Sequence, residues 1–419
     1  MSEQADAHDH PSTANSVQDF GREFKLYITA QAVSVVGDRV AIIALTFLVI
    51  KLSNSFAPAL AVYFVCRLLP TLIGGLLVGV FVDRYNRRHL MVGCDVGRAV
   101  LLAAVPSLGA LTLWTLYPIV VVLYAFTIVF ETAARAALPD VIPESRMIGA
   151  NAIIQGIENG GDLAYVVGGA LIYLFSLQAP FYLDAATFLV SALCVFAMRV
   201  PSIGAGKLSS WKEVPDLVRG GFTHLWGNPF LKWSTIVLGL APVAGGAAFV
   251  LTPLFAQHAL GHGSTGPLAS GAFRYSLLQS GEAVGAVLGT LLAGRLASRM
   301  PLGALFGIGV TGTGLADGSL GFVSSIYPAM AALLVAGFFN SLFIICGVTL
   351  VQTLTPTEVR GRAFAARYTV VNTALALGAG LGGVLLLVFS YRGLWFLEGA
   401  VIVLSSLFVW LIPEVRGQP

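Results

Sequence analysis

The feature of this sequence that most constrains its fold is a succession of long apolar segments joined by short polar loops. A helix needs roughly 20 apolar residues to cross a bilayer, and a dozen segments reach about that length. The sequence therefore predicts an all-α membrane protein with twelve transmembrane helices in two pseudo-symmetric six-helix bundles. The predicted spans, one to twelve, cover residues 24–50, 56–82, 90–111, 118–138, 149–176, 180–199, 233–257, 272–294, 302–323, 328–352, 363–387 and 394–412.

Composition excludes a soluble fold. Of the 419 residues, 57% are hydrophobic and 11% are charged, whereas soluble domains carry about 25% charged residues. The first residues are polar and lack the basic-then-apolar order of a signal peptide. We expect a disordered cytoplasmic tail (1–22), an N-terminal bundle (23–199), a cytoplasmic linker (200–232), a C-terminal bundle (233–412) and a short cytoplasmic tail (413–419).

The distribution of basic residues predicts the orientation in the membrane. Cytoplasmic loops carry an excess of Lys and Arg, and most of the 24 basic residues fall on the side that holds both termini and the linker. In or beside the opposite loops lie Lys51, Arg274 and Arg392. We therefore expect a multi-pass protein of the cell membrane with both termini in the cytoplasm.

Polar side chains inside the predicted spans mark a candidate cavity. Gln31, Ser34 and Asp38 follow Tyr27 at helical spacing, so they form one stripe along span one, while Arg39 points about 100° away. An ionised side chain at mid-membrane is costly and calls for an explanation. The stripes predict a cavity for proton and substrate. Its candidate residues are Gln31, Ser34, Asp38, Arg39, Arg67, Glu131, Arg135, Gln155, Glu158, Asp162, Gln279 and Glu282.

Some of these charges also fit a structural interpretation. Glu131 with Arg135, and Asp95 with Arg98, have the spacing of ion pairs within one helix. Three further acids, Asp184, Asp317 and Glu398, lie close enough to predicted span ends that solvation accounts for them.

The loop between spans two and three carries a charged motif, GVFVDRYNRR, from Gly79 to Arg88. An Asp followed by several Arg can pair across a bundle interface in one conformation and be solvated in the other, which makes a two-state latch. A plain positive-inside anchor is the alternative. After span ten, the loop TLTPTEVRGRAFAAR pairs a proline with an acid and arginines. The candidate latch residues are Gly79, Asp83, Arg84, Arg87, Arg88, Glu358, Arg360 and Arg362.

These loops resemble a known family. GVFVDRYNRR resembles the signature loop of the major facilitator superfamily, and the loop after span ten, with RLLP at 67–70, is similar to its bacterial macrolide and multidrug efflux branch. The resemblance implies that Asp83 and the neighbouring arginines hold the cytoplasmic bundle ends together when the carrier faces outward. Antiporters of this family often carry Gly-Pro in span five, where this chain has Ala164 and Tyr165, and this departure weighs against export.

The function that these features favour is secondary transport of a small molecule, and not enzyme catalysis. We expect proton-coupled efflux of amphipathic or drug-like molecules by alternating access. An exporter of a siderophore or lipid-like metabolite and an uptake carrier are alternatives, and a non-transporting membrane sensor or scaffold would have little need of polar stripes.

Other partners and cofactors are not expected. The stretch SIGAGKLSS (202–210) lacks the residues of a phosphate-binding loop, and the six histidines are dispersed, so we expect neither ATP hydrolysis nor a metal. A formal charge of +3 argues against nucleic acid as a partner. The protein's surroundings are the lipid bilayer, and a monomer is favoured.

Overall fold

The computed structural model describes residues 20–82, 84–109, 111–143, 146–199, 223, 225–261 and 263–411. Within these ranges the regular structure is helical, and no β-strand occurs. The helices of the N-terminal half are α1 (Arg22–Leu52), α2 (Ala57–Val82), α3 (Arg87–Ala104), η2 (Val105–Ser107), α4 (Leu113–Val141), α5 (Met147–Gly161), η4 (Asp162–Ala164), α6 (Tyr165–Leu174) and α7 (Ala179–Ala197). Those of the C-terminal half are α9 (Pro229–His258), η6 (Gly266–Ala269), α10 (Gly271–Ala297), α11 (Leu302–Ser319), η7 (Leu320–Phe322), α12 (Ile326–Leu354), α13 (Thr357–Leu385) and α14 (Tyr391–Trp410).

Ten helices among the described residues are long and apolar enough to cross a membrane, which confirms an all-α membrane protein. The predicted span at 149–176 is interrupted, because α5 ends in two glycines and the 3₁₀ turn η4 separates it from α6. Glycine is a poor helix former, which favours a break there. The predicted span at 302–323 corresponds to α11, which is not among these ten helices.

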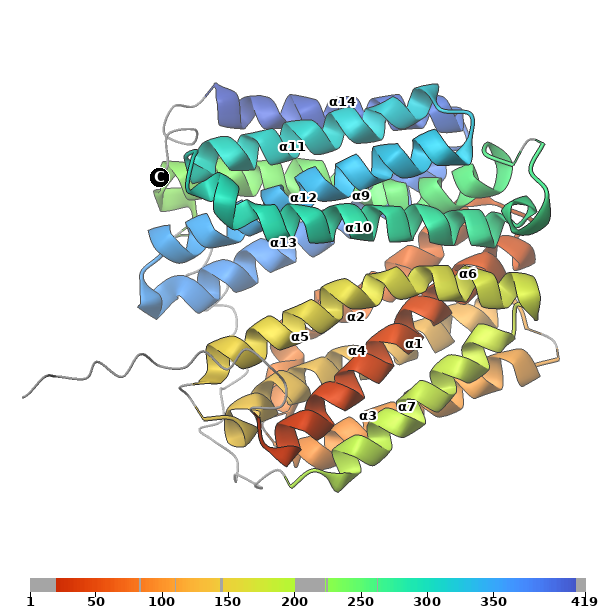
Figure 1. Cartoon of the computed structure of the whole chain (residues 1–419), viewed down its shortest axis with the longest axis vertical. Helices are drawn as coiled ribbons and strands as arrows, with labels where there is room; N and C mark the ends of the chain where they lie inside the picture. Colours follow the sequence, from red (N-terminus) through yellow and green to blue (C-terminus); the bar gives the residue numbers. More distant parts are fainter. Residues whose placement is uncertain are drawn as a thin grey trace, which may run out of the picture.

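The helices form two groups that follow the chain order (Figure 1). Helices α1 to α7 lie together in one group and α9 to α14 in the other. In the first group α1 and α3 pack against α7, and in the second α10 packs against α12 and α11 against α14. The two groups contact each other mainly through α2 with α13 and α6 with α10.

The halves are joined at one end of the molecule. One buried apolar cluster contains residues of both halves, and in it Phe64 stacks on Phe249 with ring centroids 5.4 Å apart. At Gly383 of α13, a Cβ would lie 3.1 Å from the Ala57 carbonyl oxygen and 3.2 Å from Pro58 Cα, so only glycine permits this approach. The other two apolar clusters each belong to a single half and lie at the opposite end. The halves are therefore packed together at one end and separate at the other.

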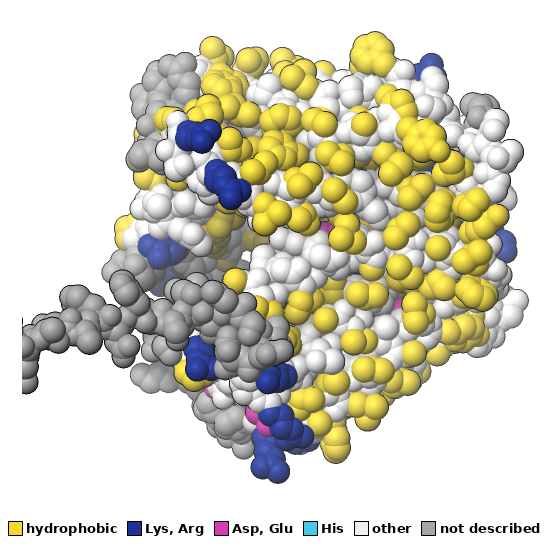
Figure 2. Space-filling view, viewed as in Figure 1, with side chains coloured by type: hydrophobic (Ala, Val, Ile, Leu, Met, Phe, Trp, Pro, Cys, Tyr) yellow, Lys and Arg dark blue, Asp and Glu magenta, His cyan; other side chains and the backbone are white. Residues whose placement is uncertain are grey.

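The outer surface suits a bilayer. Large apolar side chains are exposed on the helices, for example Leu193, Leu291 and Leu404, and Figure 2 shows hydrophobic side chains over the middle of the visible face. Most of the Lys and Arg side chains in this view gather at its left and lower left. This arrangement matches an apolar belt that contacts lipid tails, bounded by a basic end.

Candidate functional site

A cavity of about 1000 Å³ lies where the two halves separate. The N-terminal half contributes lining residues from α2 and α4, including Thr71 and Arg135, and every long helix of the C-terminal half, α9 to α14, contributes others. Ligand pockets in proteins commonly enclose roughly 300 to 1,000 Å³. The cavity can therefore hold an organic molecule of drug size.

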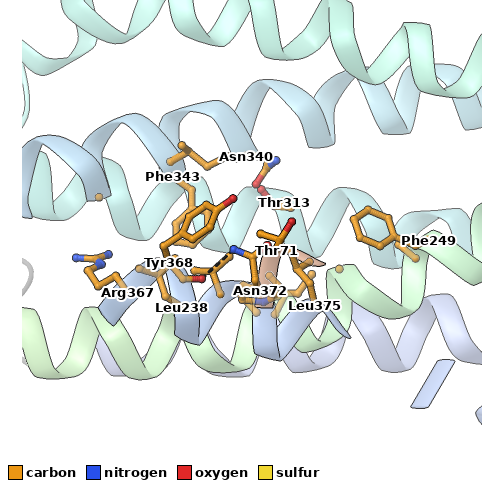
Figure 3. A pocket seen from close by; sticks show the side chains of 18 of the residues that line it. Thr71, Leu238, Phe249, Thr313, Asn340, Phe343, Arg367, Tyr368, Asn372 and Leu375 are labelled. Atoms are coloured by element: carbon orange, nitrogen blue, oxygen red, sulfur yellow. Dashed lines mark hydrogen bonds between the residues drawn. The ribbon is translucent and has the colours of Figure 1, made fainter. Parts of the chain in front are cut away.

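The walls combine apolar and aromatic side chains with a few neutral polar groups. Figure 3 shows Tyr368, Asn340 and Thr313 grouped around the cavity, with Arg367 toward one end and Phe249 toward the other. Asn372 Nδ2 donates a hydrogen bond of 2.9 Å to the Tyr368 carbonyl oxygen, which leaves its side-chain oxygen available. Such a lining suits an amphipathic ligand, because aromatic faces contact its apolar part and the amides bind its polar part.

Five charged side chains line this cavity among the described residues: Arg135, Glu282, Asp317, Arg367 and Glu398. The Arg367 Nη1 atom lies 3.4 Å from Ser234 Oγ. All three acids come from the C-terminal half. The acids of the lining therefore outnumber its arginines.

The expectation that Asp184, Asp317 and Glu398 are solvated near span ends is wrong. Their exposed fractions are 1%, 9% and 3%. Asp184 is packed against α1 and accepts a 2.9 Å hydrogen bond from Thr187 Oγ1, while Asp317 of α11 and Glu398 of α14 line the cavity. Neighbouring helices bury these three acids. The position of a residue along its own span does not show which other helices cover it.

Of the cavity residues predicted from sequence, Arg135, Gln279 and Glu282 line this cavity. The others lie outside its lining: Gln31, Ser34, Asp38, Arg39, Arg67, Glu131, Gln155, Glu158 and Asp162. Ser34 is buried between helices at 3% exposed. The lining acids that the sequence interpretation missed, Asp317 and Glu398, share one signal, a single charge in an otherwise apolar segment.

An ion-pair network joins α1 to the interrupted span. The Arg39 Nε atom lies 2.5 Å from Asp162 Oδ1, and its Nη2 atom lies 3.8 Å from Glu158 Oε2. The guanidinium carbon is 5.9 Å from the Tyr165 ring centroid, within cation–π distance. The structure thus brings the predicted charges of spans one and five together through Arg39.

Asp38 lies next to this network and is half-buried. The cations that act on its carboxylate are Arg98, Arg39 and Arg67. Arg67 in turn lies 5.2 Å from the Tyr124 ring centroid, on the neighbouring helix α4. Three guanidinium groups, from α1, α2 and α3, therefore act on the predicted coupling acid.

The two predicted intrahelical pairs are both present. Glu131 Oε2 and Arg135 Nη2 are 3.3 Å apart, and both side chains are exposed, at 41% and 78%. Asp95 and Arg98 form a fully buried ion pair, with the guanidinium 4.0 Å from the Phe188 ring centroid. This second pair links α3 to α7, and its burial fits the structural interpretation.

The predicted latch lies at the end where the halves separate. Asp83 and the Glu358 side chain lie outside the described residues. Gly79 has open space where a Cβ would be. Arg84 and Arg362 are exposed. Arg87 bonds Asp140 Oδ2 at 2.7 Å, Arg88 donates to the Phe196 carbonyl oxygen, and Arg360 Nη2 donates to the Thr355 carbonyl oxygen at 3.2 Å. The contacts of Arg87 and Arg88 stay within the N-terminal half and hold α3 to α4 and α7.

The chain is similar to curated bacterial transporters over most of its length. It is 26% identical over 373 residues to the uncharacterized MFS-type transporter YfiS of Bacillus subtilis. The aligned region covers 85% of this chain and 85% of YfiS. It is 25% identical over 358 residues to the enterobactin exporter EntS of Escherichia coli, which covers 82% of this chain and 81% of EntS.

Solved transporters share its fold at low sequence identity. A bacterial homologue of the iron transporter ferroportin in the inward-facing state superposes with a TM-score of 0.72 at 14% identity, over 94% of this chain and 99% of that one. A POT family transporter in complex with 5-aminolevulinic acid gives a TM-score of 0.74 at 12% identity, over 96% and 98%. The sequence profile of the Major Facilitator Superfamily matches residues 28–281 and 272–419, so this chain belongs to that family of transporters and is not an enzyme.

Proposed function

We propose that this protein is a proton-coupled secondary transporter that exports amphipathic small molecules by alternating access. The observation that carries the proposal is the cavity of about 1000 Å³ between the halves, with its mixture of aromatic, amide and charged side chains. A membrane sensor or scaffold without a ligand would gain nothing from such a cavity.

The packing of the halves supports alternating access. They are joined through Phe64, Phe249 and Gly383 at one end and separate at the other, where the latch motif lies. With both termini in the cytoplasm, the cavity opens to the cytoplasm and receives its substrate there. In this proposal the segments 149–176 and 302–323 also cross the membrane, which completes two bundles of six spans on either side of the 200–232 linker.

The charges of the lining favour a neutral or cationic substrate. The lining contains three acids, Glu282, Asp317 and Glu398, and two arginines, Arg135 and Arg367. An anion entering the C-terminal part of the cavity would meet more acids than arginines there. The resemblance of the charged loops to macrolide and multidrug exporters agrees with this substrate class.

Export of a siderophore is the second candidate. It is favoured by the similarity to the enterobactin exporter EntS, which extends over 82% of this chain. At 25% identity the lining side chains can differ, so the substrate must be tested directly.

Transport in proteoliposomes tests both candidates. Purified protein is reconstituted in vesicles loaded at acidic pH, and uptake of ethidium, chloramphenicol or enterobactin is followed with and without a pH gradient. We expect ethidium or chloramphenicol to accumulate only when the lumen is acidic, and a protonophore to abolish this accumulation. Accumulation of enterobactin alone would favour the second candidate. Uptake at the same rate with and without the gradient would contradict proton coupling. If no probe enters faster than it enters protein-free vesicles, the proposed function is contradicted.

A further inference from the structure

Three carboxylic acids from three different helices line the C-terminal part of the cavity. Glu282 comes from α10, Asp317 from α11 and Glu398 from α14, and all three line the same space. The charged groups that act on Glu398 are Asp317 and Glu282, and the one that acts on Asp317 is Glu282. The three acids therefore interact with one another across helices.

Close backbone packing positions two of these acids. A Cβ built at Gly399 would lie 2.5 Å from both the Gly314 carbonyl oxygen and Gly318 Cα. Helices α11 and α14 thus approach each other almost backbone to backbone, as small residues allow in membrane proteins. Glu398 directly precedes the contact glycine on α14, and Asp317 directly precedes Gly318 on α11. The approach that needs glycine therefore brings the backbone segments that carry Asp317 and Glu398 close together.

Glu398 is buried without a partner. It is 3% exposed, and the described residues supply no hydrogen-bond partner for either of its carboxyl oxygens. The Trp395 Nε1 atom, one turn earlier on the same face of α14 and also in the cavity lining, lacks a partner as well. A buried carboxylate with neither a hydrogen bond nor a cation is strongly destabilising. Glu398 is therefore a buried acid whose charge no described group compensates.

Within the part of the chain that the structure describes, no cation acts on the three acids. Besides one another, the charged neighbour is Asp162 of η4, which acts on Glu282 and is itself paired with Arg39. The other titratable groups of the lining are Tyr275 of α10, Arg367 and Tyr368 of α13, and Arg135 of α4. In contrast, Asp38 faces three arginines. Carboxyls that share one site without a cation cannot all ionise, so they hold protons in common.

We propose that Glu282, Asp317 and Glu398 form a shared proton-binding site in the C-terminal half, with Glu398 as its innermost member. A carboxylate oxygen takes up a proton from water on the side to which the cavity opens, and the same O–H bond breaks to release the proton on the other side after the conformational change. The assignment of this proton as the coupling ion rests on the proposed function. The binding of a proton at these three acids does not depend on the proposed function.

Infrared spectroscopy tests proton binding without transport. The purified full-length protein in detergent is titrated with acid and base, and the C=O absorption of protonated carboxyl groups is recorded. We expect Glu398→Gln to remove a component of this band and to shift the titration of the remainder, because the three groups are coupled. Asp317→Asn is the second variant, should Glu398→Gln fail to fold. An unchanged band in whichever of these variants folds would overturn the shared site.

Transport then tests the coupling role. In vesicles that show gradient-driven ethidium uptake by the wild type, Glu398→Gln and Asp317→Asn should lose the response to the gradient while ethidium exchange at equal concentrations continues. The matched control is Asp184→Asn, an equally buried acid outside the lining, which should keep the response.

Retained gradient-driven uptake in both cavity variants, with loss in Asp38→Asn, would return coupling to Asp38 and overturn the assignment. Binding of a second cationic probe, tetraphenylphosphonium, is measured in the same variants. If Glu398→Gln and Asp317→Asn lose this binding but keep the gradient response, the acids bind a cationic substrate and the assignment is overturned. A wild type that does not respond to the gradient contradicts the proposed function and leaves the infrared result intact.

Discussion

Arg39 and Asp162 are bonded, Nε to Oδ1 at 2.5 Å, across 123 positions of sequence. Asp162 begins the 3₁₀ turn that interrupts the span between α5 and α6. The pair therefore ties the middle of α1 to the one place where the neighbouring span departs from α-helix. Their side chains are 21% and 36% exposed, so the pair is neither fully solvated nor fully buried.

Removing one partner of this pair should destabilise the protein. We expect Arg39→Gln to lower the free energy of unfolding by about 1 to 3 kcal/mol, between the values for exposed and fully buried pairs. The thermal unfolding midpoint in detergent measures the effect. Arg39→Gln combined with Asp162→Asn should cost less than the sum of the single changes. Arg22→Gln, which removes an exposed contact with Glu23, is the control and should leave the midpoint unchanged. Additive single effects would contradict a direct interaction.

The orientation in the membrane can be read from cysteine labelling. In a variant without the four native cysteines, a Cys at Thr265, in the loop between α9 and α10, should react with an impermeant maleimide added to intact cells. A Cys at Ser298, after α10, should be protected until the cells are opened. Both positions are exposed in the structure. The reverse pattern would place the termini outside the cytoplasm.

The joined end of the two halves should depend on Gly383. Valine there would collide with the start of α2, because a Cβ already meets the Ala57 carbonyl oxygen at 3.1 Å. We expect Gly383→Val to separate the halves at this end and to lower maleimide labelling of Thr369→Cys, an exposed residue of the cavity lining, from the opposite end. Gly380→Val, where a Cβ meets open space, is the matched control. Equal labelling in both valine variants would show that this contact does not determine the conformation.

The latch remains a prediction from the motif. If Asp83 pairs with basic residues of the other bundle when the carrier faces outward, Asp83→Asn should slow turnover without reducing membrane insertion. Lys51→Gln, which removes an exposed charge at the opposite end, should keep the wild-type rate. A wild-type rate for Asp83→Asn would leave the motif with the role of a positive-inside anchor.

The sequence by itself determined the helical segments of this protein. The span predicted at 328–352 is α12 (Ile326–Leu354), and the one predicted at 272–294 is α10 (Gly271–Ala297). Both agreements have a local cause, since the length of an apolar segment and the polar residues that bound it are properties of neighbouring residues. The intrahelical pair of Asp95 and Arg98 was predictable for the same reason.

Only the tertiary structure decided which charges face the cavity. Asp317 and Glu398 are ordinary single acids in the sequence, and both are buried near the place where α11 and α14 pack backbone to backbone at Gly399. Arg39 points away from the stripe on its own helix and finds its partner in a span far along the chain. Burial and pairing of a charge depend on the helices packed around it. The hydrophobic periodicity of one segment does not specify which distant segments pack against it.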